Sequence, residues 1–186
     1  MAKTLIKSLT ASSSSSLDFV DGTSDVVMDS TYPVYEFHFL NIHPATDNVN
    51  FTFQVNATDD AGGGYDTSQI TSTVTAAYHK EDGGGGYYIY ESGFDQANGT
   101  GYQHIGSYVG YDNDQACSGV LTLYDPSSTT YVKHFTSNIN IATRDEYSRQ
   151  LLAAGYINDT TAIDEISFKF SSGNIDAGTI KMFGVS

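Results

Sequence analysis

The sequence is poor in basic residues and cysteine, and it has no tryptophan. It holds 8 Lys and Arg against 22 Asp and Glu, for a net charge of −14. Nucleic acids and anionic membranes both select basic surfaces, so we expect no nucleic-acid binding and no membrane insertion. Cys117 is the only cysteine, which excludes an internal disulfide. Its apolar neighbours predict a buried, unreactive thiol.

Long apolar runs are also absent. No segment approaches the roughly 20 apolar residues of a membrane span, and Met1–Lys7 lacks the apolar run of a signal peptide. We therefore expect synthesis and assembly in a cytoplasm. Charged residues make up only 16% of the chain, whereas tyrosine and phenylalanine are frequent. This balance favours a surface that other proteins cover, because interface centres are poor in charge and rich in aromatic residues.

Residues that could carry chemistry are scattered. The five histidines show no paired spacing of a metal site, and the acidic clusters Asp112–Asp114 and Asp59–Asp60 do not follow a calcium-loop pattern. Glu36, Glu91 and Asp95 are candidates for a glycoside hydrolase pair, which is the enzymatic alternative. We expect a protein that is not an enzyme, with no catalytic residues, no cofactor and no metal.

Alternation of apolar and polar residues is the main structural signal. In Val49–Asn56 every odd position is apolar and every even position is polar, as in a strand with one buried face. Loops rich in glycine separate several such runs, so we predict an all-β fold: an antiparallel β-sandwich, jelly-roll-like, with roughly ten strands and at most one short helix. The other expected strands include Tyr35–Phe39, Ile70–Tyr78, Tyr87–Glu91, Val120–Tyr124, Tyr131–Phe135, Ile166–Phe170 and Thr179–Gly184, with loops at Ala61–Tyr65, Asp82–Tyr87 and Asp125–Thr129.

Two segments allow alternatives. Arg144–Ala154 has good helix formers and could be a short helix, but Leu151–Ile157 could equally be a strand entered from a loop. Residues 1–20 are expected to form an N-terminal arm or edge strand, which could add to the sheet of a neighbouring subunit, and residues 21–186 a single β-sandwich domain. Within the arm, the run Ser12–Ser16 is either a flexible tether or part of a sheet edge.

The C-terminal segment predicts a hairpin. Gly173, Asn174 and Gly178 permit a tight reversal of the backbone. In such a hairpin, Phe168 and Phe170 would pair with Ile180 and Met182 across adjacent strands.

Tyrosines gather around the glycine-rich loops. Because a tyrosine ring can anchor a protein interface, stack on a sugar or pack in a core, all three roles stay open. The candidate interface or glycan-contact residues are Tyr87, Tyr88, Tyr90, Tyr108 and Tyr111.

Several stretches resemble small virion structural proteins of marine tailed phages, such as cyanophages, which include decoration and fibre domains with jelly-roll folds. The closing segment Phe170–Gly184 carries this resemblance most strongly. The other similar stretches are Asn41–Asp47, Ala77–Asp82, Tyr124–Thr130, Val132–Phe135 and Thr161–Ile166.

The resemblance implies a phage structural protein on the particle exterior, located in the virion after assembly in the host cytoplasm. The first expectation is capsid decoration and stabilisation by self-association. Its partners would then be copies of itself, with a trimer favoured, and other virion proteins. The alternative is a tail-fibre or receptor-binding module that recognises host surface glycans. The resemblance brings no catalytic residues with it.

Overall fold

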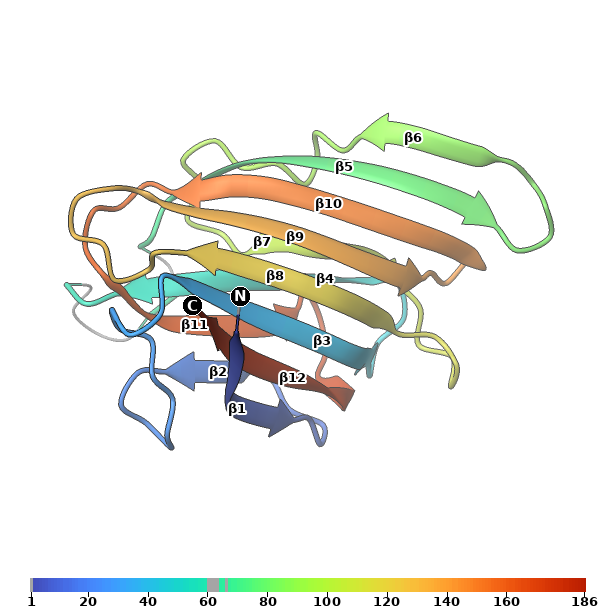
Figure 1. The fold of residues 1–186 in the computed structure, drawn as a ribbon. Coiled ribbons are helices and arrows are strands. Elements are labelled where there is room, and N and C mark those ends of the chain that lie inside the picture. Colours follow the sequence, from blue (N-terminus) through green and yellow to red (C-terminus); the bar gives the residue numbers. More distant parts are fainter. Residues whose placement is uncertain (1, 60–63, 66) are drawn as a thin grey trace.

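The computed structural model describes residues 2–59, 64–65 and 67–186, and this part of the chain forms twelve strands and no helix. The strands build two antiparallel sheets that face each other as a sandwich (Figure 1). The predicted all-β sandwich is therefore confirmed. The larger sheet has the order β1 (Lys3–Thr10), β12 (Ile175–Val185), β3 (Val34–Pro44), β8 (Cys117–Tyr124), β9 (Lys133–Ala142), β10 (Tyr147–Ile157), β5 (Ile70–Lys80) and β6 (Gly86–Tyr90), and the smaller sheet has the order β2 (Leu17–Val20), β11 (Ile163–Phe170), β4 (Val49–Ala57) and β7 (Gln103–Val109).

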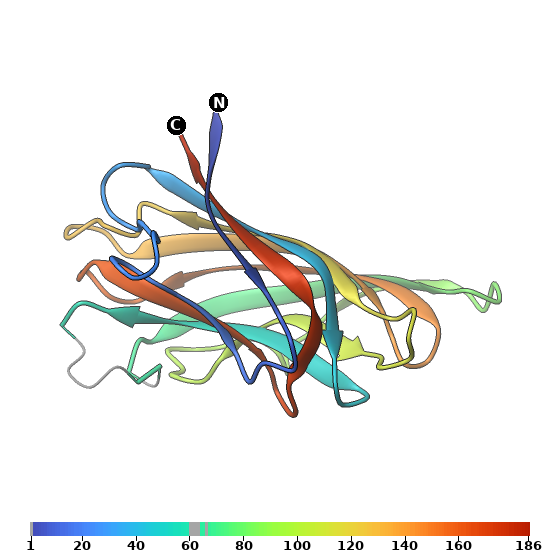
Figure 2. The same ribbon diagram turned by 90° about the horizontal axis from the view of Figure 1, so that it is seen from below.

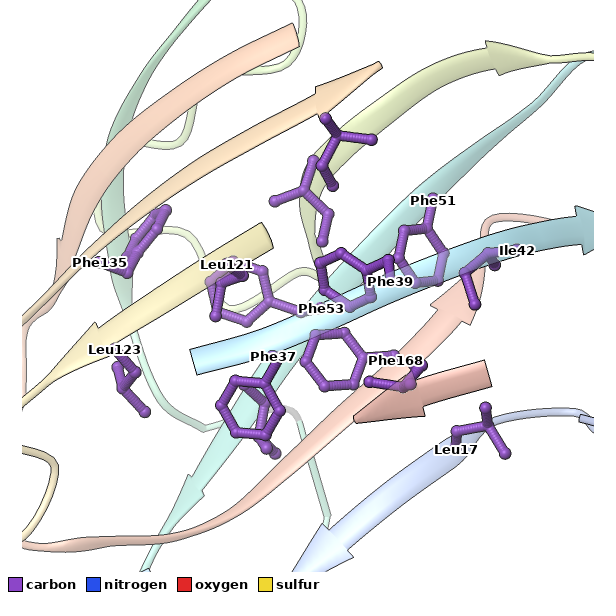
Figure 3. Packing of buried hydrophobic residues seen from close by; sticks show 14 of the residues in the cluster. Leu17, Phe37, Phe39, Ile42, Phe51, Phe53, Leu121, Leu123, Phe135 and Phe168 are labelled. Atoms are coloured by element: carbon purple, nitrogen blue, oxygen red, sulfur yellow. The ribbon is translucent and has the colours of Figure 1, made fainter. Parts of the chain in front are cut away.

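Phenylalanine rings from both sheets interlock at the centre of the sandwich (Figure 3). The ring of Phe168 on β11 lies 5.3 Å from Phe37 and 5.2 Å from Phe39, which come from β3 in the opposite sheet. Within its own sheet, Phe168 lies 6.1 Å from Phe51 and 6.5 Å from Phe53. All five rings are buried. Their tilted, edge-on and stacked contacts stabilise the sandwich beyond the burial of apolar area.

The predicted C-terminal hairpin is wrong. Phe168 pairs with β4 and β2 in the smaller sheet, whereas Met182 pairs with β3 and β1 in the larger one. Residues 171–174 thus carry the chain from one sheet to the other. Both strands direct apolar residues into the same core. The sequence pattern is therefore the same whether β11 and β12 are neighbours in one sheet or lie in opposite sheets.

Gly178 lies inside β12 rather than in a turn. Its φ of +114° is unfavourable for other residues, and a Cβ atom there would lie 2.5 Å from the carbonyl oxygen of Asn41. The register between β12 and β3 shifts at this point, so the glycine permits a β-bulge.

The ambiguous segment Arg144–Ala154 contributes to a strand. Residues 147–157 form β10, which pairs along its whole length with β9 and β5. Leu151 and Ala153 point into the core, while Gln150 and Leu152 point outward. The helical alternative fails because burial follows a period of two residues, and pairing on both sides outweighs helix propensity.

The N-terminal segment adds to the sheet of its own chain. Residues 3–10 form β1, an edge strand that pairs with β12, and Ser14 makes an isolated bridge to Ile175. The expected loops join β5 to β6 and β8 to β9. Most of the predicted loop Ala61–Tyr65 lies outside the described residues.

Replacing Phe168 with alanine should lower the free energy of unfolding by about 4 kcal/mol, because it opens a cavity at the centre of the core. Urea denaturation followed by circular dichroism measures this loss. Tyr131→Ala is the control, since Tyr131 is 71% exposed and its loss should cost no more than about 0.5 kcal/mol. Equal effects for the two variants would contradict the proposed packing.

Candidate functional site

The outward face of the larger sheet carries a broad surface without formal charges. Strands β8, β9, β10 and β5 contain three Lys or Arg residues and no Asp or Glu. Lys133 and Arg149 are buried, and Lys80 lies at the end of β5, where it pairs with Asp82 at 3.2 Å. We call this surface the uncharged face; its outward side chains include Ser118, Val120, Thr122, Thr136, Asn138, Asn140, Ser148, Gln150, Leu152, Ala154, Thr73, Thr75 and Ala77.

A shallow open groove of about 550 Å³ crosses the uncharged face near its β6 end. The Gln150 side chain donates a hydrogen bond to the side-chain amide oxygen of Asn138 at 2.9 Å, and Asn140 donates to the Ser148 hydroxyl at 3.1 Å. These contacts join β9 to β10 and fix the amide groups on the groove floor. The groove is lined by Ala77, Tyr78, His79, Gly86, Tyr87, Asn138, Asn140, Ser148 and Gln150.

Three of the five candidate tyrosines come together on β6. Tyr87, Tyr88 and Tyr90 are all exposed, and Tyr88 is 71% exposed. Tyr88 pairs with the groove residue Ala77, whereas Tyr87 pairs with Tyr78, and their two rings lie 5.2 Å apart on the inner face of the sheet. The Tyr90 hydroxyl donates to Asp95.

The other two candidate tyrosines lie elsewhere. Tyr108 is on β7 in the smaller sheet, and Tyr111 follows that strand in a loop. The Tyr108 ring packs on the Arg149 side chain, with its centroid 5.1 Å from the guanidinium carbon. Thus only the β6 tyrosines share one strand, with Tyr88 and Tyr90 on the outer face and Tyr87 on the inner face.

Sequence reasoning missed a buried ion pair next to these tyrosines. Arg149 on β10 pairs with Glu91, the residue that follows β6, and donates to the Ser107 hydroxyl at 2.8 Å. The guanidinium carbon lies 5.0 Å from the Tyr78 ring centroid, opposite Tyr108. Burial lowers the pKa of Arg149, yet an arginine remains charged at neutral pH. The sequence contained one signal for this buried cation: the alternation at Arg149-Gln-Leu151 places Arg149 on the inner face, together with Leu151.

Lys133 is a second buried cation. Its ammonium group donates to the backbone carbonyls of Asp159, at 3.1 Å, and Thr161. Burial lowers the pKa of Lys133, and the carboxylates of Asp159, Asp125 and Asp59 oppose this effect. Lys133 thereby holds the loop between β10 and β11 against the start of β9.

Each carboxylate considered for hydrolysis has an internal partner. Glu36 accepts from Lys3 at 2.6 Å and contacts His38 at 2.7 Å, and although burial opposes the shift, these partners hold its pKa below the ordinary value. Asp95 accepts from the backbone N–H of Val74 at 2.6 Å, and Glu91 binds Arg149. Each of the three carboxylates is thus engaged by other groups of the chain.

The described residues contain no group of three or more His, Cys, Asp or Glu spaced to hold a metal ion. Asp112 and Asp114 border a small hollow, and the backbone N–H of Gln115 donates to the Asp112 carbonyl in a turn. Asp60 lies outside the described residues. Cys117 is buried on β8, as predicted, and burial raises the pKa of its thiol.

Replacing Glu91 with alanine should lower the free energy of unfolding by about 3 kcal/mol, because it leaves the Arg149 charge buried without its partner. Asp145→Ala is the matched control: Asp145 pairs with Arg144 at 3.3 Å on the surface, and its loss should cost less than about 1 kcal/mol. Urea denaturation of both variants measures the difference. A Glu91→Ala cost as small as that of the control would rule out a structural role for the buried pair.

Comparisons with known proteins give no family for the chain. No protein-family model matches it, and searches of curated proteins and of solved structures returned no significant match. In the described part of the chain, no helix has the length and hydropathy needed to cross a membrane.

Proposed function

We propose that this chain is a structural, non-enzymatic protein of a tailed-phage particle. It lies on the particle exterior and decorates the capsid through contacts with its own copies and with other virion proteins. The uncharged face of the larger sheet carries this proposal. In a chain with a net charge of −14, strands β8, β9, β10 and β5 place no acidic side chain on that face.

Charge placement on this surface favours a protein partner. A sheet face that stays in water commonly carries charged side chains, which oppose association. Here the outward positions hold Thr, Asn, Ser, Gln and Ala, with Leu152 40% exposed among them. Most of the acidic residues lie instead outside the strands, in loops such as 111–116 and 143–146. Neutral polar and small apolar side chains can be desolvated at lower cost than charges, so this face is suited to burial.

The resemblance to virion proteins of marine phages supports the same proposal. Its strongest stretch, Phe170–Gly184, corresponds to the end of β11, the crossing between sheets and nearly all of β12. Such a segment builds the sandwich rather than a reactive site. The family resemblance and the uncharged face therefore both favour a structural role.

Cryo-electron microscopy of the whole particle tests the proposal directly. Capsid decoration predicts hundreds of copies on the particle exterior, whereas a tail or fibre location predicts at most a few tens. Absence of the chain from purified particles would refute the proposal.

A charge placed on the uncharged face should block assembly. Leu152→Glu should reduce incorporation into particles at least about tenfold, since burying an unpaired carboxylate is costly. Tyr131→Glu adds the same charge at a 71% exposed position between β8 and β9 and should incorporate normally. Quantitative immunoblotting of particles, with circular dichroism to verify folding, measures both. Normal incorporation of Leu152→Glu would exclude this face as the contact.

The groove favours a second candidate function, recognition of host surface glycans. Neutral sugars present hydroxyl groups and apolar ring faces, which amides and aromatic rings bind. Asn138, Asn140 and Gln150 supply the amides. The exposed ring of Tyr88 lies on the same face of the sheet, because Tyr88 pairs with the groove residue Ala77. A receptor-binding module of a tail fibre would use such a site.

Binding to an array of bacterial surface glycans tests this second function. If the groove binds sugar, Gln150→Ala combined with Tyr88→Ala should weaken binding at least about tenfold, since one hydrogen bond and one ring contact are lost. Tyr131→Ala, outside the groove, should leave binding unchanged. Lack of binding to every glycan by the intact chain would argue against this candidate.

A further inference from the structure

We propose that β6 is the self-association strand of this protein: it pairs antiparallel with β6 of a second copy about a two-fold axis, which joins two eight-stranded sheets into one. The choice of a second copy rests on the proposed structural function. The location on β6 rests on the geometry of the sheet edges.

The sandwich has four sheet edges, and β6 is the one without protection. Natural edge strands avoid pairing through charges, bulges, shortness or coverage. At the other end of the larger sheet, β1 carries Lys3 and Lys7 and a register shift between residues 5 and 7. In the smaller sheet, β2 has only four residues and includes Asp18.

The fourth edge, β7, is covered by the segment that follows β6. The Phe94 ring stacks on His104 at 4.8 Å, and Gln103 donates to the Phe94 carbonyl at 3.1 Å. By contrast, the run Gly83–Tyr90 contains no charged residue and no proline. Figure 2 shows that the turn between β5 and β6 extends beyond the rest of the sandwich, where a second chain can reach it.

Backbone geometry leaves the hydrogen-bonding groups of Tyr88 directed toward the free edge. The N–H of Glu91 donates to the carbonyl of Val74 on β5 at 2.9 Å. In an antiparallel ladder the N–H and C=O of a residue point to the same side, and the side alternates along the strand. Tyr87 and Ile89 therefore face β5, and Tyr88, at the centre of β6, faces outward.

A two-fold axis at Tyr88 satisfies these groups reciprocally. The Tyr88 N–H donates to the carbonyl of the partner's Tyr88, and the partner's Tyr88 donates in return. Tyr87 then lies opposite the partner's Ile89, so the side-chain pairs are aromatic or apolar. The segment brings no like charges together, although each chain carries a net charge of −14.

This arrangement predicts a dimer, where the sequence analysis expects a trimer. A two-fold contact uses the same strand on both copies, so it closes after two subunits. Because β6 borders β5, pairing would also merge two uncharged faces into one continuous surface for a neighbouring virion protein.

Light scattering after size exclusion, together with analytical ultracentrifugation, tests the proposal on the full chain. The intact protein should have the mass of two 20.1 kDa chains. Tyr88→Pro removes the outward N–H but no bond to β5, and Tyr88→Glu places like charges opposite each other. Each should raise the dissociation constant at least about 100-fold. Tyr88→Phe should remain dimeric.

Tyr131→Glu is the matched control, since it makes the same change in charge at a residue of equal exposure, 71%. It should remain dimeric. Circular dichroism and the urea midpoint verify that each variant is folded. If Tyr88→Pro is unfolded, the test depends on Tyr88→Glu. A monomeric or trimeric intact chain, or a dimer that both variants preserve, would overturn the proposal. A monomer that is nevertheless present on particles would refute only β6 pairing, whereas a β6 dimer absent from particles would refute only the virion function.

Discussion

Interlocking of phenylalanine rings between two sheets of unequal size is the constraint on which this structure depends. Phe168 contacts rings on β3 in the opposite sheet and on β4 in its own sheet, so it links the layers at their centre. Four strands cannot cover the inner face of eight. At the β10–β5 end of the larger sheet, the inner face is closed by tyrosine rings and by the Arg149–Glu91 pair.

The Arg149–Glu91 pair holds β6 in place at the edge of the larger sheet. Glu91 directly follows β6, and Arg149 lies on β10, two strands away in the sheet. Their ion pair therefore fixes the position at which the chain leaves the edge strand. Burial of two charges is costly, and the Ser107 hydroxyl and two aromatic faces offset part of this cost. A strand held in one position at its end is better prepared for pairing, because less conformational entropy is lost on binding.

The outer surface follows from the same alternation that builds the core. Each inward Leu or Ile on β9 and β10 forces its neighbours outward, and those neighbours include Asn138, Asn140, Gln150 and Leu152 but no Asp or Lys. The uncharged face and the uncharged edge at β6 meet along β5. Under the proposed virion function, the neutral face and the neutral edge would mediate association, while the acidic loops would repel copies that approach in other orientations.

The sequence by itself determined the fold class, the buried position of Cys117 and most strand positions, because a period of two in hydrophobicity depends only on local geometry. It also named the β6 tyrosines as candidate contact residues, but it indicated neither their exposure nor their separation from Tyr108 and Tyr111. Tertiary structure alone decided which strands are neighbours: Phe168 and Met182 face each other across the sandwich instead of pairing in a hairpin. Pairing on both sides also made β10 a strand. The Arg149–Glu91 pair joins residues 58 positions apart, and such long-range partners leave no local signal in a single sequence.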